Sequence, residues 1–162
     1  MNKIEKAIYY VNKQVENHSA YVWSGQGQKL RKVKAEQLAM MESNAENAAR
    51  VIKYIFNNLK LFNKNTRVFD CSGLICCALI YAGVLSKGSD YTAADLYPMF
   101  DRITISKAHP GDLIYKTDSS GKIVHVGLCV EIGYCIEAKG RDYGVVRSRI
   151  DSSWKLANRP NY

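Results

Sequence analysis

Apolar residues in the first part of the chain recur at steps of three and four, the spacing of helices with one buried face. Near the N-terminus this spacing links Ile4, Ala7, Ile8, Val11 and Val15. A second set runs through Leu38, Met41, Ala45, Ala48, Ile52 and Ile55. The second set predicts one long helix over 35–59. The first region, up to about residue 60, is therefore expected to be helical.

The middle of the chain contains a run that is apolar almost all round and ends at Gly83. A run of this kind predicts a central buried helix with a glycine at its C-cap. The helix would begin at or near Cys71. After it, Thr92 and Asp95 are spaced to cap a further short helix that extends through Met99.

The last part of the chain reads as short strands joined by tight turns. The strands are expected at 112–115, 123–130, 134–138 and 143–147, with turns at 118–121, 133 and 140–142. Turns of this length predict an antiparallel sheet. Helices followed by strands predict an α+β fold. No repeat or linker divides the chain, so we expect a single domain over 1–162.

The charge balance favours an anionic partner. The net charge is +8, from 23 Lys and Arg against 15 Asp and Glu, which suits a nucleic acid, an acidic membrane or an anionic cell wall. No nucleic acid is expected, because the chain lacks a recognised motif and a basic helix with interleaved aromatics. No segment approaches about 18 consecutive apolar residues, so no membrane span is expected. The N-terminal helix is amphipathic and unlike a signal peptide, which predicts synthesis in the cytoplasm without one.

Five cysteines are an odd number, and none forms a Cys-x-x-Cys pair. A disulfide framework is unexpected in a chain long enough to build a core. We therefore expect free thiols made in a reducing compartment, of which one or two at most are functional. The sequence predicts no metal site and no cofactor.

Cys71 is the candidate nucleophile, because a helix N-terminus and a nearby imidazolium both favour the thiolate. The chain has three histidines, His18, His109 and His125. The first follows the opening helix and the second lies in a loop before a proline. Only His125 lies in a predicted strand, so it is the best placed to be held rigidly against a helix N-terminus.

Strand alternation makes a specific prediction about the histidine. It places the side chain of His125 on the same face as those of Ile123, Gly127 and Cys129. Taken singly, a buried cysteine and a strand histidine are more often structural than catalytic. The residues around them carry the functional interpretation.

Four motifs follow one another along the chain. They are Tyr21-Val22-Trp23-Ser24-Gly25, Asp70-Cys71-Ser72-Gly73-Leu74, Pro110-Gly111-Asp112-Leu113-Ile114-Tyr115 and His125-Val126-Gly127-Leu128. In this order the chain resembles the NlpC-type family of papain-like cell-wall cysteine endopeptidases, over about 15–147. The resemblance implies a papain-like α+β fold, with N-terminal helices and the nucleophile at the N-terminus of a central helix packed on an antiparallel β-sheet.

The resemblance also implies the catalytic roles. Cys71 matches the family nucleophile and His125 the general base. A third polar residue, usually a histidine, orients the imidazole in the family, and Glu137 stands at its position. A carboxylate can hold the tautomer and stabilise the imidazolium. The alternative is that Glu137 is an ordinary surface acid and that the site is a dyad.

Four further residues are assigned to substrate binding through the resemblance. Tyr21 matches a tyrosine that lines the family's active site, and Trp23 is assigned with it. Asp70 and Ser72 match residues that contact the stem peptide, where the acid pairs with a free amino group. Asp70 could also be the N-cap of the central helix. The backbone N–H of Cys71 is a natural oxyanion donor.

The chain departs from the family pattern at three points. Ser24 stands where the family usually has a second glycine, and a helical insert occupies about 28–66. The insert could wall the cleft, bind a partner or merely pack. The residues of this sequence are expected to form the catalytic domain alone, without a separate wall-binding module. Such compact forms resemble phage or prophage lysis or tail enzymes, so the predicted place of action is the cell wall, reached through phage lysis or a tail structure.

The function implied is hydrolysis of an amide bond in the peptidoglycan stem peptide, which is the expected partner. The bond typical of the family joins γ-D-glutamate to a diamino acid. Three alternatives stay open: an N-acetylmuramoyl-L-alanine amidase, a thiol acyltransferase, and a catalytically inactive wall-binding module. The sequence makes no prediction of the oligomeric state.

Overall fold

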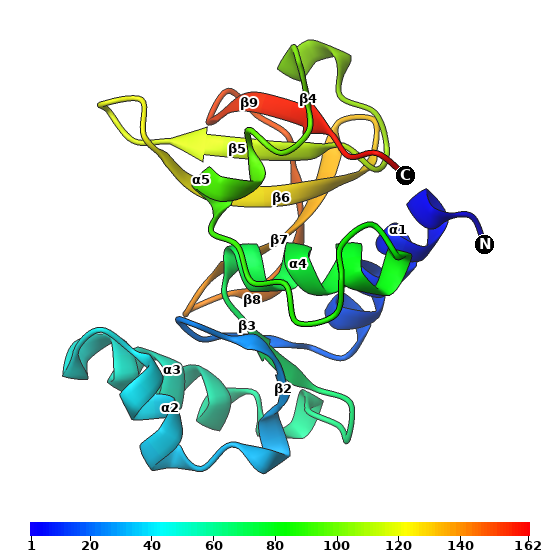
Figure 1. Cartoon of the computed structure of the whole chain (residues 1–162). Coiled ribbons are helices and arrows are strands. Elements are labelled where there is room, and N and C mark those ends of the chain that lie inside the picture. The colour runs from blue at the N-terminus through cyan, green and yellow to red at the C-terminus, as the bar shows by residue number, and fades with distance from the viewer.

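Helix α4 (Cys71–Ala82) crosses the middle of the molecule in the computed structural model, which describes residues 1–162 (Figure 1). Its N-cap is Asp70, whose side chain accepts a hydrogen bond from the backbone N–H of Gly73 at 2.6 Å. The helix ends at Gly83, where a φ of 74° is the left-handed conformation that favours glycine. The start, the end and the burial of this helix are as the apolar run predicts.

A six-stranded antiparallel sheet lies beside α4, in the order β4-β9-β5-β6-β7-β8. Its strands are β4 (Asp101–Ile103), β5 (Leu113–Thr117), β6 (Ile123–Glu131), β7 (Tyr134–Gly140), β8 (Gly144–Arg149) and β9 (Trp154–Arg159). The four strands expected from the sequence are present. Strands β4 and β9 were not predicted, although β9 lies inside the sheet, between β4 and β5. The α+β fold is confirmed.

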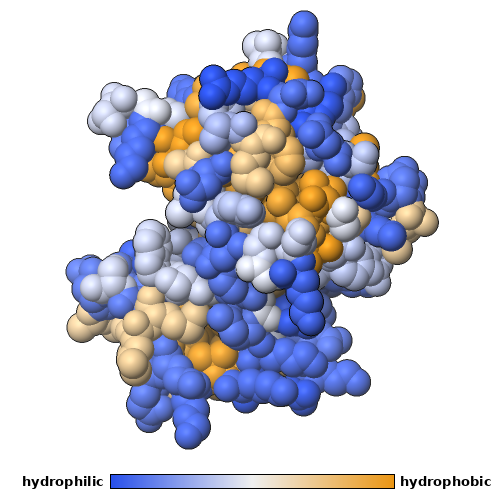
Figure 2. All heavy atoms as spheres, viewed as in Figure 1, coloured by the Kyte–Doolittle hydropathy of each residue, from blue (hydrophilic) through white to orange (hydrophobic).

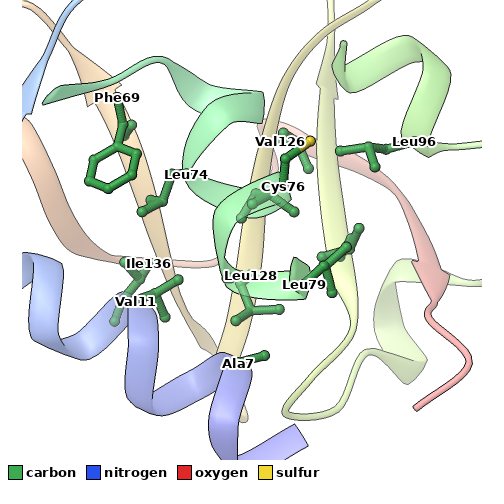
Figure 3. Packing of buried hydrophobic residues seen from close by; sticks show 14 of the residues in the cluster. Ala7, Val11, Phe69, Leu74, Cys76, Leu79, Leu96, Val126, Leu128 and Ile136 are labelled. Carbon is green, nitrogen blue, oxygen red and sulfur yellow. The ribbon is translucent and has the colours of Figure 1, made fainter. Parts of the chain in front are cut away.

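The main core is formed where α4 and helix α1 (Lys3–Glu16) pack against one face of the sheet (Figure 3). Helix α1 contributes Ala7 and Val11, and α4 contributes Leu74 and Leu79, all fully buried. Burial of a leucine-sized side chain is worth about 1.5–3 kcal/mol. The packing therefore fixes the start of α4 relative to the sheet, which is what a helix-borne nucleophile requires.

Shorter elements connect these parts. Helix α5 (Ala93–Leu96) begins with the capping box of Thr92 and Asp95 that the sequence predicts, but it ends at Leu96 and does not reach Met99. The 3-10 turns are η1 (Leu30–Lys32), η2 (Leu59–Leu61) and η3 (Ile105–Lys107). None of the helices combines the length and the apolar character needed to cross a bilayer.

A second, smaller sheet carries the insert. It consists of β1 (Ala20–Tyr21), β3 (Arg67–Phe69) and β2 (Gln26–Lys29) in that order, with β1 parallel and β2 antiparallel to β3. Helices α2 (Ala35–Met41) and α3 (Ala45–Asn57) follow β2 and precede β3 in the chain, and they lie at the lower left of Figure 1. They form a small core of their own with the sheet, made of Ala20, Val22, Leu38, Val51 and Val68.

The prediction of one long helix over 35–59 was wrong. The backbone turns out of the helix at Glu42, with φ −84° and ψ 151°, and α3 starts again after Asn44. The side chain of Asn44 accepts from the N–H of Asn47 at 2.9 Å, the usual N-cap arrangement. The apolar spacing continues across the break because both helices pack on the same small core, so spacing alone did not reveal it.

Candidate active site

A cleft of about 680 Å³ opens where the starts of α4 and β6 meet the turn between β7 and β8. Figure 2 shows the surface hollowed on the left, between the sheet and the helical insert. Six of the seven residues assigned to the site from the sequence line this cleft. They are Tyr21, Trp23, Asp70, Cys71, Ser72 and His125. The seventh, Glu137, lies behind His125 and is buried.

Cys71 is the first residue of α4, and its thiol is partly buried at the helix N-terminus. Burial raises the pKa of this thiol to about 11, with a further contribution from the charge of Asp70, while the backbone N–H groups of Val126 and Ser72 act in the opposite direction. Near neutral pH the thiol is therefore protonated. A nucleophilic thiolate forms here only if a neighbouring base accepts the proton.

Asp70 is the N-cap of α4, and its side chain also lines the cleft. Its Oδ1 accepts from the N–H of Gly73 at 2.6 Å and from Ser72 Oγ at 3.4 Å. Burial raises the pKa of Asp70, and the hydrogen bonds from Gly73 and Ser72 counteract this. The two possible roles of Asp70, as cap and as cleft residue, are thus compatible in space.

The loop before β2 is packed so tightly that it needs special backbone geometry. A side chain on Gly73 would place its Cβ 2.1 Å from the carbonyl oxygen of Gly25, so the helix can approach the loop only with glycine there. Ser24 adopts φ 60°, in the left-handed region. Serine at this position therefore keeps the glycine-like loop shape, at a conformational cost that glycine would not have.

His125 is held from behind by Glu137. The distance between Nε2 of His125 and Oε2 of Glu137 is 2.6 Å, and only 1% of the Glu137 side chain is exposed. Because an ionised carboxylate only accepts hydrogen bonds, Nε2 carries a proton and Nδ1 of the neutral ring is left as the acceptor. Glu137 is thus no ordinary surface acid.

The ionisation of Glu137 follows from its surroundings. Burial by itself would raise the pKa of Glu137, but hydrogen bonds from His125 and Ser148, with the charges of His125 and Lys116, outweigh it and lower the pKa below its ordinary value. Nζ of Lys116 lies 4.0 Å from Oε2 of Glu137. The carboxylate is therefore charged near neutral pH and can stabilise an imidazolium.

The ring of His125 also packs against Trp154, with the ring centroids 5.6 Å apart. A Cβ on Gly127 would lie 3.0 Å from the same indole, which explains the glycine two residues after the histidine. The prediction that Ile123 shares the face of His125 was wrong. The register of β6 shifts between these two residues, so Ile123 packs with Val126 against the main core.

Tyr21 forms the floor of the cleft next to the thiol. Burial, followed by the charges of Cys71 and Asp70, raises the pKa of Tyr21 above its usual range, so its hydroxyl stays neutral. The guanidinium of Arg141 lies over the ring, 5.4 Å from its centroid. Tyr21 therefore lies between the thiol of Cys71 and the guanidinium of Arg141, which belongs to the turn between β7 and β8.

A sequence model of the NlpC/P60 family matches residues 18–157. The chain belongs to the NlpC/P60 family. The family that the four motifs indicated is thereby confirmed, and the match covers most of the chain, including the insert.

Solved NlpC/P60 structures share the fold. The P60 domain of an antigen from M. avium subspecies paratuberculosis is 23% identical, with a TM-score of 0.61 and 98% of each chain covered. The peptidoglycan hydrolase RipB from Mycobacterium tuberculosis is 23% identical, with a TM-score of 0.61 over 99% of this chain and 68% of RipB. RipD from the same organism, a non-catalytic NlpC/p60 domain protein adapted to peptidoglycan binding, is 20% identical, with a TM-score of 0.64 over 98% of each chain. No curated protein matches the chain.

The remaining motif of the NlpC/P60 pattern, Pro110-Gly111-Asp112, is structural in this protein. Asp112 accepts from the backbone N–H of His109 at 2.8 Å and from Arg159 at 2.8 and 2.7 Å. These bonds fix the entry into β5 and its neighbour β9. His109 borders a different pocket, and His18 lines none of the larger ones, so His125 is the histidine of the cleft.

Several cleft residues were not found from the sequence. They include Arg50, Thr92, Lys122, Lys139, Arg141 and Tyr143. Arg50 comes from the insert, and the last three belong to β7 and the turn that follows it. No spacing in the sequence connects them with Cys71, because they reach the cleft only through tertiary packing. The structure brings together no group of three or more His, Cys, Asp or Glu side chains suited to a metal ion.

Proposed function

We propose that this NlpC/P60 protein is a cysteine peptidase that hydrolyses an amide bond of the peptidoglycan stem peptide. The observation that carries the proposal is the arrangement of Cys71 at a helix N-terminus and His125 in one cleft, with Glu137 bonded to the far nitrogen of the imidazole at 2.6 Å. The bond proposed joins γ-D-glutamate to a diamino acid. The reaction needs no metal and no organic cofactor.

In the first half of the reaction, Nδ1 of His125 takes the proton of Cys71, and the thiolate attacks the carbonyl carbon. The carbonyl oxygen becomes an oxyanion, which the backbone N–H of Cys71 can stabilise at the start of α4. The imidazolium, paired with Glu137, then protonates the leaving amine as the C–N bond breaks. An acyl-enzyme thioester and a free amine result.

In the second half, His125 takes a proton from water, and the resulting hydroxide attacks the thioester carbonyl. The C–S bond breaks, a carboxylic acid is released, and the thiolate recovers its proton from the imidazolium. Glu137 keeps the same tautomer in both halves. Its low pKa supports this role, because a charged carboxylate stabilises each imidazolium that forms.

The substrate-binding roles proposed for Tyr21, Trp23, Asp70 and Ser72 agree with their place in the cleft. Asp70 would receive a free amino group of the peptide, and the aromatic rings would contact its aliphatic parts. The net charge of +8 supports accumulation on an anionic wall.

The experiment is digestion of purified peptidoglycan of several chemotypes, with the released fragments read by mass spectrometry. Wild type should release fragments whose masses identify the γ-D-glutamyl bond, and Cys71→Ala should release none. Cys77→Ala is the matched control, because it removes another partly buried thiol of α4 that does not line the cleft. Walls left intact by wild type in every chemotype would contradict hydrolysis.

The alternatives give different products in the same experiment. An amidase would release the whole peptide with a free L-alanine amino group. An acyltransferase would leave the wall uncut until an amine acceptor is added, and the acceptor would appear in the product mass. An inactive module would sediment with the wall without altering it.

A further inference from the structure

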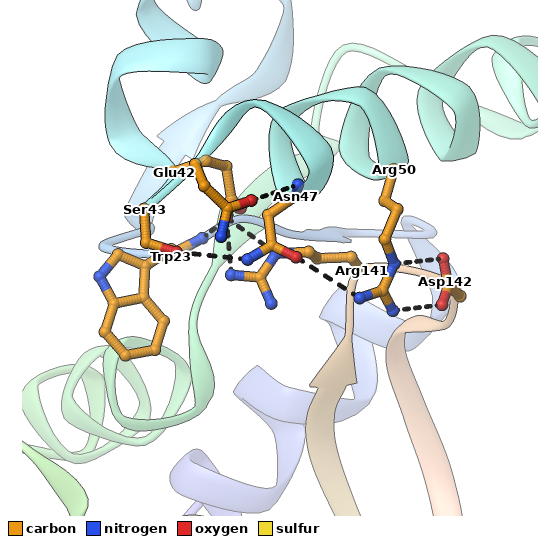
Figure 4. Close-up of polar contacts among 8 residues, drawn as sticks. Trp23, Glu42, Ser43, Asn47, Arg50, Arg141 and Asp142 are labelled. Atoms are coloured by element: carbon orange, nitrogen blue, oxygen red, sulfur yellow. Dashed lines mark hydrogen bonds and ion pairs between the residues drawn. The ribbon is translucent and has the colours of Figure 1, made fainter.

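The helical insert is connected by ion pairs and a hydrogen bond to the turn between β7 and β8, which forms one side of the cleft (Figure 4). Three contacts join them: Glu42 with Arg141, Arg50 with Asp142, and the Tyr54 hydroxyl with the carbonyl of Tyr143. All three partners in the turn are consecutive. The insert therefore determines where this turn lies, although it is remote from it in sequence.

Glu42 is the most buried of these contacts. No part of its side chain is exposed; Oε2 accepts a hydrogen bond from Nε of Arg141 at 2.8 Å and forms an ion pair with Nη2 at 2.6 Å. Its other oxygen, Oε1, accepts from the backbone N–H of Trp23 at 2.9 Å. One buried carboxylate thus joins two segments that line the cleft. Removal of one member of a buried pair leaves the other charge uncompensated, so the contact is strongly constrained.

Arg141 is held in a way that leaves part of its guanidinium free. Nε donates to Glu42, Nη2 forms the ion pair with the same oxygen, and the guanidinium lies over the ring of Tyr21. Nη1 has no partner in the protein, yet no buried side-chain nitrogen or oxygen is without one. Nη1 is therefore accessible, in a residue that lines the cleft. A fixed guanidinium with free N–H groups suits a carboxylate.

The charges around the cleft favour the same ligand. Its basic lining residues are Arg50, Lys122, Lys139 and Arg141, whereas Asp70 is its one acidic lining residue. Asp142 and Glu42 offset two of the cations, and the two lysines remain. Apart from Asp70 at the start of α4, the charged side chains that line the cleft are thus cationic.

We propose that Arg141, positioned by Glu42 of the insert, forms a subsite that binds a carboxylate of the wall peptide. The inference rests on the proposed function for the identity of the substrate. Glu42 touches neither the thiol nor the imidazole, so it is a positioning residue. It fixes the guanidinium at the floor formed by Tyr21, and the substrate then binds between the cationic turn and the acidic cap of α4.

The test uses synthetic stem peptides in which the α-carboxylate of D-glutamate or the free carboxylate of the diamino acid is replaced, one at a time, by the amide. Wild type should cleave the parent peptide about tenfold more efficiently than one of the two amides, the usual effect of one charge-assisted hydrogen bond. The peptide that is cleaved less efficiently identifies which of the two carboxylates binds to Arg141. The difference should appear in KM.

Variants then assign the subsite. In Glu42→Gln and Arg141→Lys the preference for carboxylate over amide should fall to about twofold or less, since neither keeps a fixed fork. Glu36→Gln is the matched control, an exposed glutamate of the same insert, and it should keep the full preference. Arg141→Lys retains the charge and most of the aliphatic stem, so it can test the subsite even if Glu42→Gln does not fold. An unchanged preference in a folded variant of either kind would overturn the proposal.

Peptide binding to Cys71→Ala, measured by calorimetry, tests the subsite without catalysis. The parent peptide should bind about tenfold more tightly than the discriminated amide, and Glu42→Gln in this background should remove the difference. Equal affinities for the parent and both amides, or no binding of any of them, would refute the subsite. Failure of wild type to cleave any peptide contradicts the proposed function alone, so the two failures are distinguishable.

Discussion

The two sides of the cleft are built by contacts of very different range. On the thiol side, Asp70 caps α4 through Gly73, three residues away, and His125 meets Glu137, twelve residues away on the next strand. On the opposite side, Glu42 meets Arg141 across 99 residues. The contacts that hold each catalytic group join residues at most twelve apart, whereas those that hold Arg141 join segments about a hundred residues apart.

The groups proposed for catalysis and the groups proposed for peptide specificity are therefore held by different parts of the structure. The thiol and the imidazole are fixed by a helix and a sheet that share the main core, so their geometry is independent of the insert. The cationic side depends on two helices with a small core of their own and on ion pairs with the turn. On the proposed function, changes in the insert should therefore alter which peptide binds while Cys71, His125 and Glu137 stay in place. The predictions below test this separation, from the largest effect to the smallest.

Removal of the thiol should give the largest difference between the effect on turnover and the effect on peptide affinity. Cys71→Ala should reduce kcat by at least about a thousandfold, because Cys71 is the only thiol that lines the cleft. Affinity for the stem peptide should change little, since the cationic side is untouched. Turnover and calorimetric affinity measure the two effects. Affinity lost in parallel with turnover would show that the sides are not independent.

Loss of the base should change the pH dependence of the thiol. Because burial raises the pKa of Cys71 to about 11, His125→Ala should be alkylated by iodoacetamide at pH 7 at least roughly a hundredfold more slowly than wild type. Its rate should rise with pH towards that value. The modified Cys71 peptide is followed by mass spectrometry. Identical pH profiles in the two proteins would exclude His125 as the base.

Glu137→Gln should lower kcat by roughly tenfold to a hundredfold, because the imidazolium loses its charged partner. The pKa of Glu137 is lowered in the folded protein, so its ionisation stabilises the fold above the unfolded-state pKa, and this stabilisation is lost as pH falls through the folded-state pKa. The difference in Tm between wild type and Glu137→Gln should thus be largest near pH 7 and shrink below about pH 4. A constant difference would contradict an ionised Glu137.

The exposed ion pair of the insert should have a smaller effect. Arg50→Asp should raise KM by roughly twofold to threefold with kcat unchanged, since surface pairs contribute little. The double variant Arg50→Asp, Asp142→Arg should recover most of the loss, and the effect should weaken in high salt. Steady-state kinetics at two ionic strengths give the answer. A fall in kcat would place the insert in the chemistry.

The smallest effect is expected in the loop between the two sides. Ser24→Gly should raise Tm by roughly 2 °C, because glycine adopts φ 60° without the steric cost of a Cβ. Ser24→Ala, which keeps the Cβ, should bring no such gain. Kinetic constants should not change in either. A lower Tm for the glycine variant would mean that the hydroxyl contributes more than the backbone conformation costs.

The sequence by itself determined the parts that depend on neighbouring residues. The cap of α4 at Asp70, its end at Gly83, the capping box of Thr92 and Asp95, and four of the six strands of the large sheet follow from spacings within a few residues. The four motifs together also indicated the family and six of the residues that line the cleft. These features are local because hydrogen bonds at helix ends and turns join residues three or four apart.

Only the tertiary structure decided the rest. It breaks the expected long helix at Glu42, places Trp154 behind His125 through an unpredicted strand, shifts the register that removes Ile123 from the histidine's face, and brings Arg141 over Tyr21. Each of these results depends on which segment lies opposite, and in the case of Arg141 over Tyr21 that segment is more than a hundred residues away. The apolar and polar pattern of a segment specifies how much of it is buried, but it does not specify the partner, since many segments present equally apolar faces.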